Sequence, residues 1–324
     1  MLITFRPYSD PYINIAAEEY FVKHSTDDMC MIWINDRSVI IGKHQNAYAE
    51  INYPFLKANN IPVIRRISGG GAVYHDRGNV NFSFITKTGN GSQVDFGRFT
   101  SIIVKFMQSL GLEVNISKRN SLFVGNLKFS GHAEHIFHNR VLHHGTILFS
   151  TDLKILQEAI TPIREYQSKA MPSVRSDVGN VAPLLPYTID IHGFVELFIS
   201  WLLRFYEGSV LYEAKPNEHE AIRNLADTKY KIWEWNFGYS PAYTFTVYLQ
   251  TFTALTPIIC KVENGKFVQI DVVQPESQAL PLLLSNLKGI FHKEEEIDNF
   301  VQKNKQELEQ SGINTVSFSE QFFS

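Results

Sequence analysis

Residues 65 to 84, RRISGGGAVYHDRGNVNFSF, place three consecutive glycines between an arginine pair and a histidine-aspartate pair, and an alternating segment follows. Gly69, Gly70 and Gly71 leave backbone N–H groups with no side chains beside them, so the chain can approach an anion closely and direct donors at it. The spacing matches neither the nucleoside-triphosphate loop nor the dinucleotide fingerprint. From the glycines alone, two interpretations stand: a phosphate cradle, or a strained turn at the corner of a sheet.

Charged and polar side chains flank the glycine run on both sides. Arg65 and Arg66 end the predicted strand 62–66, so the pattern predicts one guanidinium on each face of that strand. A guanidinium binds phosphate or carboxylate through two parallel hydrogen bonds, which favours an anionic ligand. His75 and Asp76 are either a general-base pair or residues that orient the loop, and the pattern does not separate these roles.

The segment 79–85, NVNFSFI, alternates polar and apolar residues, which predicts a strand with Val80, Phe82 and Phe84 on one face. That face is expected to belong to the core, and the polar face is available for chemistry. Around it, strands are predicted at 29–35, 38–42, 113–116, 121–124, 127–137 and 141–149, and helices at 14–23, 53–59, 97–112, 151–160, 192–207 and 216–226. Hairpin-like strand pairs and irregularly spaced helices predict an α+β fold with a mixed sheet rather than repeated βαβ units.

Two further details of this part of the chain follow from local rules. Asn14 precedes the first apolar helical run and is predicted to be its N-cap. The segments 29–35 and 38–42 are apolar and β-branched, and are predicted to pair with each other as strands.

The chain changes character near residue 243, where aromatic residues accumulate and a glycine and a proline interrupt the pattern. Two strand runs follow, at 243–252 and 256–273, and Asn264-Gly265 within the second predicts a tight hairpin. Amphipathic helices are predicted at 276–290 and 294–310. We therefore expect two domains, residues 1–243 and a smaller one over 245–324.

Composition limits the class of protein. A net charge of −3 and a pI near 6.4 provide no overall attraction to nucleic acid or to an anionic membrane, so we expect neither as a partner. The N-terminus shows no signal-peptide pattern and the longest apolar run is too short to span a membrane, which predicts a cytoplasmic protein. The two cysteines, Cys30 and Cys260, are expected to be reduced core residues.

A second cluster lies in GNLKFSGHAEHIFHNRVLHHGTILFS, residues 125–150, where Lys128 precedes a turn of small residues and five histidines follow between 132 and 144. His132, His135 and His138 are three residues apart, a spacing that suits a metal site on a helix. The segment carries strand and turn residues, and no cysteine or acidic ligand set completes the site, which favours histidines on a hairpin instead. Composition alone leaves Lys128 as either a solvated lysine or a functional one.

With these segments in view, the chain resembles the bacterial lipoate-protein ligases of the two-domain form. RRISGGGAVYHDRGNVNFSF is similar to the signature of that family, and KFSGHA followed by VLHHGTILFSTDL resembles its second motif, with the active-site lysine at Lys128. MPSVRSDVGNV and WEWNFG resemble two later motifs, and matching segments run from Pro11 to Gly238.

The resemblance implies a catalytic domain of the biotin/lipoate ligase type with a small α/β C-terminal accessory domain that moves during the cycle. It implies activation of lipoate by ATP and Mg²⁺ to lipoyl-adenylate, release of pyrophosphate, and transfer of the lipoyl group to a lysine of a carrier, such as a 2-oxoacid dehydrogenase E2 subunit or the glycine cleavage H protein. Lys128 is the implied catalytic residue. The implied ATP contacts are Arg66, Gly71, Ala72, Val73, Tyr74 and Lys128. The implied lipoate contacts are Lys128, Ser68, Gly70, His75 and His144, and Asn120 is a candidate for Mg²⁺ near the phosphates.

This sequence departs from the family pattern at two positions. Ser121 stands where the family commonly has aspartate, and Asp177 where it often has arginine. Three alternatives remain beside the ligase: an octanoyl transferase that uses a cysteine nucleophile, a biotin ligase, and a non-catalytic lipoate- or nucleotide-binding relative.

Overall fold

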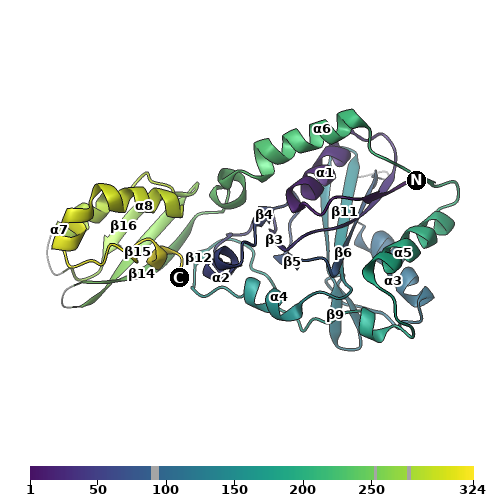
Figure 1. Ribbon diagram of the computed structural model, residues 1–324, viewed down its shortest axis with the longest axis horizontal. Coiled ribbons are helices and arrows are strands. Elements are labelled where there is room, and N and C mark those ends of the chain that lie inside the picture. The colour runs from purple at the N-terminus through teal and green to yellow at the C-terminus, as the bar shows by residue number, and fades with distance from the viewer. Residues whose placement is uncertain (89–94, 252–253, 276–278) are drawn as a thin grey trace. The chain divides into compact units, whose positions relative to one another are not determined.

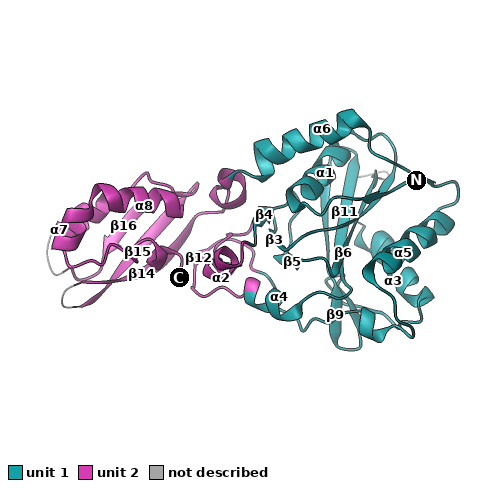
Figure 2. Ribbon diagram, viewed as in Figure 1, with its two compact units in different colours: residues 1–43, 61–158, 173–232 teal, residues 44–60, 159–172, 233–324 magenta. Residues whose placement is uncertain are grey.

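The computed structural model describes residues 1–88, 95–251, 254–275 and 279–324. The chain divides into two compact units (Figure 2). Unit 1 comprises residues 1–43, 61–158 and 173–232, and unit 2 comprises residues 44–60, 159–172 and 233–324. Unit 2 thus contains the segment from 245 onward together with three earlier segments. The functional division into residues 1–243 and 245–324 stays a prediction.

Unit 1 is built on a mixed sheet of six strands (Figure 1). The first strand pairs in parallel with its two neighbours, and the remaining pairs are antiparallel. This mixture confirms the α+β prediction. In spatial order the strands are β10 (His132–Phe137), β11 (Arg140–Leu148), β6 (Asn79–Lys87), β2 (Met29–Ile34), β1 (Leu2–Arg6) and β13 (Val210–Leu211).

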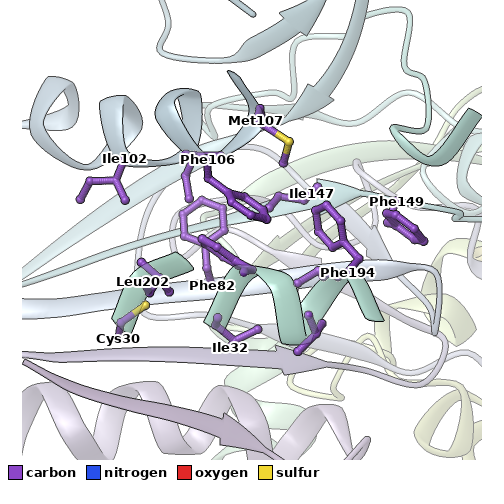
Figure 3. Packing of buried hydrophobic residues seen from close by; sticks show 14 of the residues in the cluster. Cys30, Ile32, Phe82, Ile102, Phe106, Met107, Ile147, Phe149, Phe194 and Leu202 are labelled. Atoms are coloured by element: carbon purple, nitrogen blue, oxygen red, sulfur yellow. The ribbon is translucent and has the colours of Figure 1, made fainter. Parts of the chain in front are cut away.

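The alternation in residues 79–85 separates the two faces of this sheet. Phe82 and Phe84 are fully buried in an apolar core shared with helices α3 (Phe96–Ser109) and α5 (Ile191–Phe205), part of which Figure 3 shows. Ser83 lies on the opposite face, where its hydroxyl bonds to Glu18 of helix α1 (Pro11–His24). The prediction of one core face and one polar face is therefore confirmed, although the polar face is buried as well.

The first helix begins earlier than predicted, at Pro11. Its N-cap is Asp10, whose carboxylate accepts hydrogen bonds from the backbone N–H groups of Tyr12 (2.8 Å) and Ile13 (3.3 Å). The prediction of Asn14 as the N-cap is wrong because a proline at the first helical position extends the helix by one turn. Asn14 instead bonds within the fold, its Nδ2 donating to the carbonyl of Tyr8 (2.7 Å).

Replacing Asp10 by alanine is expected to lower the free energy of unfolding by about 1 kcal/mol, because two backbone N–H groups lose their acceptor. Urea denaturation followed by circular dichroism measures this change. Asp10→Asn is the control, since asparagine also caps helices well and should retain most of the stability. Equal stability of the alanine variant and the unaltered chain would contradict the assignment of this cap.

The strands at 29–35 and 38–42 do not pair with each other, so that prediction is wrong. Both edges of β2 are occupied, by β1 and by β6, which leaves no edge for β3 (Ser38–Ile41). β3 instead joins a separate sheet, between β4 (Val63–Arg65) and β5 (Val73–His75).

The other predicted elements of the first 232 residues are present within a few residues of their predicted bounds, whereas β1, β5 and β13 correspond to no predicted strand. The single strand predicted at 127–137 is interrupted at Gly131, which separates β9 (Leu127–Ser130) from β10. β9 belongs to a small sheet with β7 (Asn115–Ile116) and β8 (Leu122–Val124). The remaining helices are α2 (Tyr53–Ala58), α4 (Leu153–Ala159) and α6 (Pro216–Leu225).

Unit 2 has a four-stranded sheet of β12 (Gln167–Ser168), β14 (Tyr243–Gln250), β15 (Leu255–Glu263) and β16 (Lys266–Val272). The predicted hairpin is confirmed, since Asn264 and Gly265 both have positive φ, 50° and 74°. Helices α7 (Ala279–Ser285), α8 (Glu294–Lys303) and α9 (Lys305–Gln310) contribute to its apolar core. Residues 276–278 of the predicted helix 276–290, and residue 252 of the predicted strand, lie outside the described residues.

No helix in the described ranges is both long and apolar enough to cross a membrane.

Candidate active site

The glycine run forms a loop between β4 and β5. Gly70 has a φ of 90°, a conformation that L side chains rarely adopt. The loop packs closely on Gly42, where a Cβ atom would lie 2.1 Å from the carbonyl oxygen of Gly70. Gly70 is exposed, and the residues around it from Gly69 to Val73 are half-exposed, so the backbone of this loop is accessible to a ligand.

The two arginines lie beneath the loop and hold its shape. Arg66 is buried, and its guanidinium donates to the carbonyl oxygens of Gly69 (2.6 Å) and Gly71 (2.8 Å). Arg65 is fully buried and donates to the carbonyl oxygens of Gly42 and Lys43, both at 3.0 Å. Arg66 thus fixes the backbone of the glycine loop, and Arg65 fixes the backbone at Gly42 and Lys43, on which the loop packs.

Three motifs that are far apart in the sequence meet around this loop. The hydroxyl of Ser68 lies 2.6 Å from Nε2 of His144 on β11. The N–H of Ala72 donates to the hydroxyl of Ser173 (2.8 Å), and the segment that begins at Ser173 runs beside β9, where the N–H of Lys128 donates to the carbonyl of Asp177 (2.9 Å). The glycine loop, the lysine segment and the segment SVRSDVGN therefore form one site.

Lys128 is half-buried at the end of this arrangement. Its Nζ lies 3.5 Å from the position that a Cβ on Gly131 would take, so the side chain folds over the glycine that separates β9 from β10. Burial, with a smaller contribution from Arg119, lowers the pKa of the Lys128 ammonium. Among the residues that the structure describes, Lys128 makes no ion pair, which leaves its charge for an anionic ligand.

His144 connects the loop to residues that sequence reasoning missed. Its Nδ1 lies 2.7 Å from Oε1 of Glu18, which also accepts the hydroxyl hydrogen of Ser83 (2.6 Å). Ser83 in turn accepts the indole N–H of Trp33 (3.0 Å). The one signal in the sequence was the polar face of the strand 79–85, because nothing in the local pattern marks Glu18 as a buried partner of a histidine.

His75 and Asp76 do not form a general-base pair. The carboxylate of Asp76 accepts the backbone N–H groups of Gly78 and Asp152, both at 2.8 Å. His75 is buried with its Nδ1 3.1 Å from Nδ2 of Asn35, and its Nε2 has no hydrogen-bond partner among the described residues. Burial, together with Arg66 and His144, lowers the pKa of His75 to about 3, so its imidazole is neutral.

The histidines of the 132–143 segment lie on a hairpin rather than on a helix, with His138 in its turn. His132 is on β10, and its ring bonds to Ser130 (3.1 Å) and to His143 (2.9 Å). His143 bonds onward to Glu134 (2.6 Å) and packs on Phe99 of α3, so it lies on the opposite sheet face from His144. Within the described ranges, no group of three or more histidine, cysteine, aspartate or glutamate residues is arranged to hold a metal ion.

Glu134 should make stability depend on pH. Burial, and the nearby Asp95, raise its pKa from 4.5 to about 7. Between these two values the folded chain binds more protons at Glu134 than the unfolded chain does, so this residue lowers stability as the pH rises. We expect Glu134→Gln to stabilise the fold relative to the unaltered chain at about pH 8 but much less at about pH 5, measured by urea denaturation. The same difference at both values would contradict the raised pKa.

Asn120 and Ser121 supply no carboxylate for a magnesium ion. Asn120 is half-buried in a turn with a φ of 58°, where its backbone N–H donates to the carbonyl of Ser117. Ser121, in the same turn, supplies no carboxylate. Mg²⁺ is usually bound by one or two carboxylates together with waters and substrate phosphates, so these two residues alone do not form a magnesium site.

Both cysteines are buried core residues, as predicted. Burial raises the pKa of the Cys30 thiol well above its usual range and that of Cys260 to about 12. Neither is therefore the accessible, activated thiolate that a cysteine nucleophile requires.

Comparisons with known proteins show what this chain is similar to. Residues 10–203 match the family model of the lipoyl protein ligase A/B catalytic domain. The chain is 40% identical over 242 residues to lipoate-protein ligase 1 of Staphylococcus aureus, covering 73% of each chain. This chain belongs to the lipoate-protein ligase family. Lipoate-protein ligase LplJ of Bacillus subtilis is another relative, with 38% identity over 244 residues and 72% of each chain covered.

Solved structures of this family share the fold. A lipoate-protein ligase A bound with ATP superposes with a TM-score of 0.60 at 26% identity, covering 74% of this chain and 100% of that chain. Protein Ta0514 of T. acidophilum with bound lipoic acid gives a TM-score of 0.61 at 25% identity, covering 73% of this chain and 98% of that chain. Two residues depart from the family pattern. Ser121 lies in the turn that also contains Asn120. Asp177 is exposed, and its carbonyl pairs with the backbone of Lys128.

Proposed function

We propose that this chain is an ATP-dependent lipoate-protein ligase. In the first step the lipoate carboxylate attacks the α-phosphate of ATP, which gives lipoyl-adenylate and pyrophosphate. In the second step a lysine amine of a carrier domain attacks the acyl carbon, which gives the lipoylated carrier and AMP. The observation that carries the proposal is the convergence of the glycine loop, the Lys128 segment and the segment from Ser173 to Gly179.

The ATP side of the site is proposed to consist of the loop from Gly71 to Tyr74, Arg66 and Lys128. The accessible backbone of the loop can donate N–H groups to phosphate oxygens, and Arg66 keeps that backbone in shape through Gly69 and Gly71. The residues involved are Arg66, Gly71, Ala72, Val73, Tyr74 and Lys128. The ATP bound in a related ligase supports this assignment.

The lipoate side is proposed to use Lys128, Ser68, Gly70, His75 and His144. Adenylation brings two negative groups together, so the main catalytic task is to position them and to neutralise their charge. A half-buried lysine without an ion-pair partner among the described residues is suited to lie between a carboxylate and a phosphate. The Nε2 of His75, buried and without a partner among these residues, offers one further polar contact to a ligand oxygen.

Magnesium is proposed to enter with ATP, as the metal-nucleotide complex that is the substrate. Bound to ATP, the metal would supply positive charge near the departing pyrophosphate, as in other phosphoryl-transfer reactions. Asn120 is the candidate for an outer contact to this complex.

The acceptors are proposed to be carrier domains of 2-oxoacid dehydrogenase E2 subunits or the glycine cleavage H protein. Residues 1–243 are proposed to catalyse both steps, and residues 245–324 to form the accessory domain. Two reduced, buried cysteines suit a cytoplasmic location.

The decisive experiment is the exchange of labelled pyrophosphate into ATP by the purified chain. Exchange that requires lipoate or octanoate is the expected result. The absence of exchange with both acids would overturn the proposal. If acyl groups instead moved between carrier proteins without ATP, the chain would be an octanoyl transferase.

A further inference from the structure

The second step of the proposed reaction requires a proton acceptor. A lysine amine has an ordinary pKa of about 10.4, so the acceptor is an ammonium ion at neutral pH and cannot attack until it loses a proton. The inference below rests on the proposed function and assigns the group that takes this proton. Histidine is the usual choice for that task. Four histidines on strands of unit 1 are considered: His75, His132, His143 and His144. His132 is unsuitable because its Nδ1 lies 2.9 Å from the ring of His143, so no carboxylate bonds to it directly to stabilise an imidazolium.

His75 is a hydrogen-bond donor and not a base. The Nδ2 of Asn14 donates to Oδ1 of Asn35 (2.9 Å), which fixes the orientation of the Asn35 amide. The Nδ2 of Asn35 therefore donates to Nδ1 of His75 (3.1 Å), and the single hydrogen of the neutral imidazole is on Nε2. A ring with an occupied Nδ1 and a protonated Nε2 has no free lone pair for the ammonium proton.

His143 is also unsuitable, because its Nε2 meets the ring of His132 and not a hydroxyl beside the glycine loop. Nδ1 lies 2.6 Å from Glu134 and Nε2 lies 2.9 Å from His132. Its ring packs on Phe99, on the face of the sheet that carries the apolar core. A proton from the glycine loop has no direct path to it.

His144 differs from the other three, because its Nδ1 meets the carboxylate of Glu18 and its Nε2 meets the hydroxyl of Ser68. The Glu18 carboxylate accepts from Nδ1, so the hydrogen of the neutral ring is on Nδ1 and the lone pair of Nε2 points at Ser68. The Glu18 oxygen is held in turn by the hydroxyl of Ser83. This geometry selects one tautomer and stabilises the imidazolium that forms when Nε2 takes a proton.

Ser68 is oriented to pass a proton in this direction. Nε of Arg66 donates to Oγ of Ser68 (3.0 Å), which occupies one lone pair and leaves the hydroxyl hydrogen for Nε2 of His144 at 2.6 Å. Ser68 directly precedes the accessible glycines, where the proposed function places the acyl-adenylate. Ser68 is itself buried, with 1% of its surface exposed, and it is the member of the relay that adjoins the accessible glycines.

We propose that Ser68, His144 and Glu18 form a proton relay for lipoyl transfer. The ammonium of the carrier lysine gives one proton to Oγ of Ser68 while the hydroxyl proton of Ser68 moves to Nε2 of His144. The neutral amine then forms the C–N bond, and the acyl C–O bond breaks with its electron pair going to the AMP phosphate. The second amine proton leaves the nitrogen to water, and His144 releases its proton to water before the next turnover. Glu18 is a positioning residue, because it acts only through His144.

The test supplies preformed lipoyl-adenylate and the lipoyl domain of an E2 subunit to the full chain, and measures single-turnover transfer. Glu18→Gln and His144→Gln are expected to slow transfer by about 100-fold or more. Glu134→Gln is the matched control, because it alters the same kind of carboxylate–histidine bond in the same sheet and should leave the rate unchanged. Equal rates for Glu18→Gln and Glu134→Gln would overturn the proposal.

Two readouts separate proton transfer from structural damage. Each pH unit below the lysine pKa changes the free amine fraction about tenfold, so the Glu18→Gln rate should rise steeply with pH and approach that of the unaltered chain. Hydroxylamine, which is neutral at neutral pH, should react with the bound adenylate at similar rates in both proteins. If Glu18→Gln remained slower than the unaltered chain both in transfer at high pH and in the reaction with hydroxylamine, Glu18 would only support the fold. An acyl group found on Ser68 by mass spectrometry would also overturn the relay, since Ser68 would then be a nucleophile.

Failure of the relay is distinguishable from failure of the proposed function. Pyrophosphate exchange measures adenylation alone. If Glu18→Gln showed normal exchange and also a normal rate of lipoyl transfer, only the relay would be rejected. Absence of exchange in the unaltered chain would reject the ligase itself.

Discussion

Replacing Lys128 by alanine is expected to lower lipoate-dependent pyrophosphate exchange by about 1,000-fold, because a preorganised charge is removed from a site where negative charge accumulates. The ammonium of Lys128 is half-buried beside Gly131 and makes no ion pair within the described residues, so the fold does not depend on its charge. Thermal unfolding of the variant should therefore stay close to that of the unaltered chain. Exchange is measured with saturating ATP and lipoate.

Lys154→Ala is the control for this prediction, since Lys154 is an exposed lysine of the same unit. It should retain full exchange. Retention of exchange by Lys128→Ala would show that the positive charge needed for adenylation comes from elsewhere.

Replacing Gly42 by alanine is expected to displace the glycine loop and to weaken ATP binding by more than about tenfold. The added methyl group would lie 2.1 Å from the carbonyl oxygen of Gly70, a distance that backbone atoms do not tolerate, so the loop must move. Overpacking of this kind costs about 1–3 kcal/mol of folding stability. The apparent KM for ATP in the exchange reaction and the free energy of unfolding test both effects.

Gly69→Ala is the matched control within the loop, because a Cβ at that position would meet no atom within 4 Å. Its free energy of unfolding should stay within about 0.5 kcal/mol of the unaltered chain. If the two alanine variants unfolded alike, the close packing of Gly42 on the loop would not be what holds its shape.

Local patterns were sufficient for most of the secondary structure. The alternation in residues 79–85 and the pair Asn264-Gly265 predicted a strand and a hairpin correctly, because these signals depend on neighbouring residues alone. Residue type alone predicts Asn14 as the N-cap, whereas Asp10 caps the helix because Pro11 at the first helical position extends it. The pairing of 29–35 with 38–42 was wrong because strand adjacency in the sequence does not reveal which sheet edges are already occupied.

The candidate site, too, could be predicted from the sequence only in part. The resemblance pointed to Lys128 and to the glycine loop from motif residues, but the position of Ser173 under Ala72 required the tertiary structure. Glu18 was not singled out at all, since a glutamate in the first helix looks like any other helical carboxylate until the helix is packed on the sheet.

The sequence by itself determined the α+β class, the family and the segments that carry the chemistry, because glycine runs, alternation and motif spacing are properties of consecutive residues. Only the tertiary structure decided what those side chains do. Strand register directs His143 into the core and His144 toward Glu18, although the two are adjacent in the chain, because successive side chains of a strand point to opposite faces. Which of two neighbouring histidines meets the glycine loop is therefore a consequence of sheet assembly.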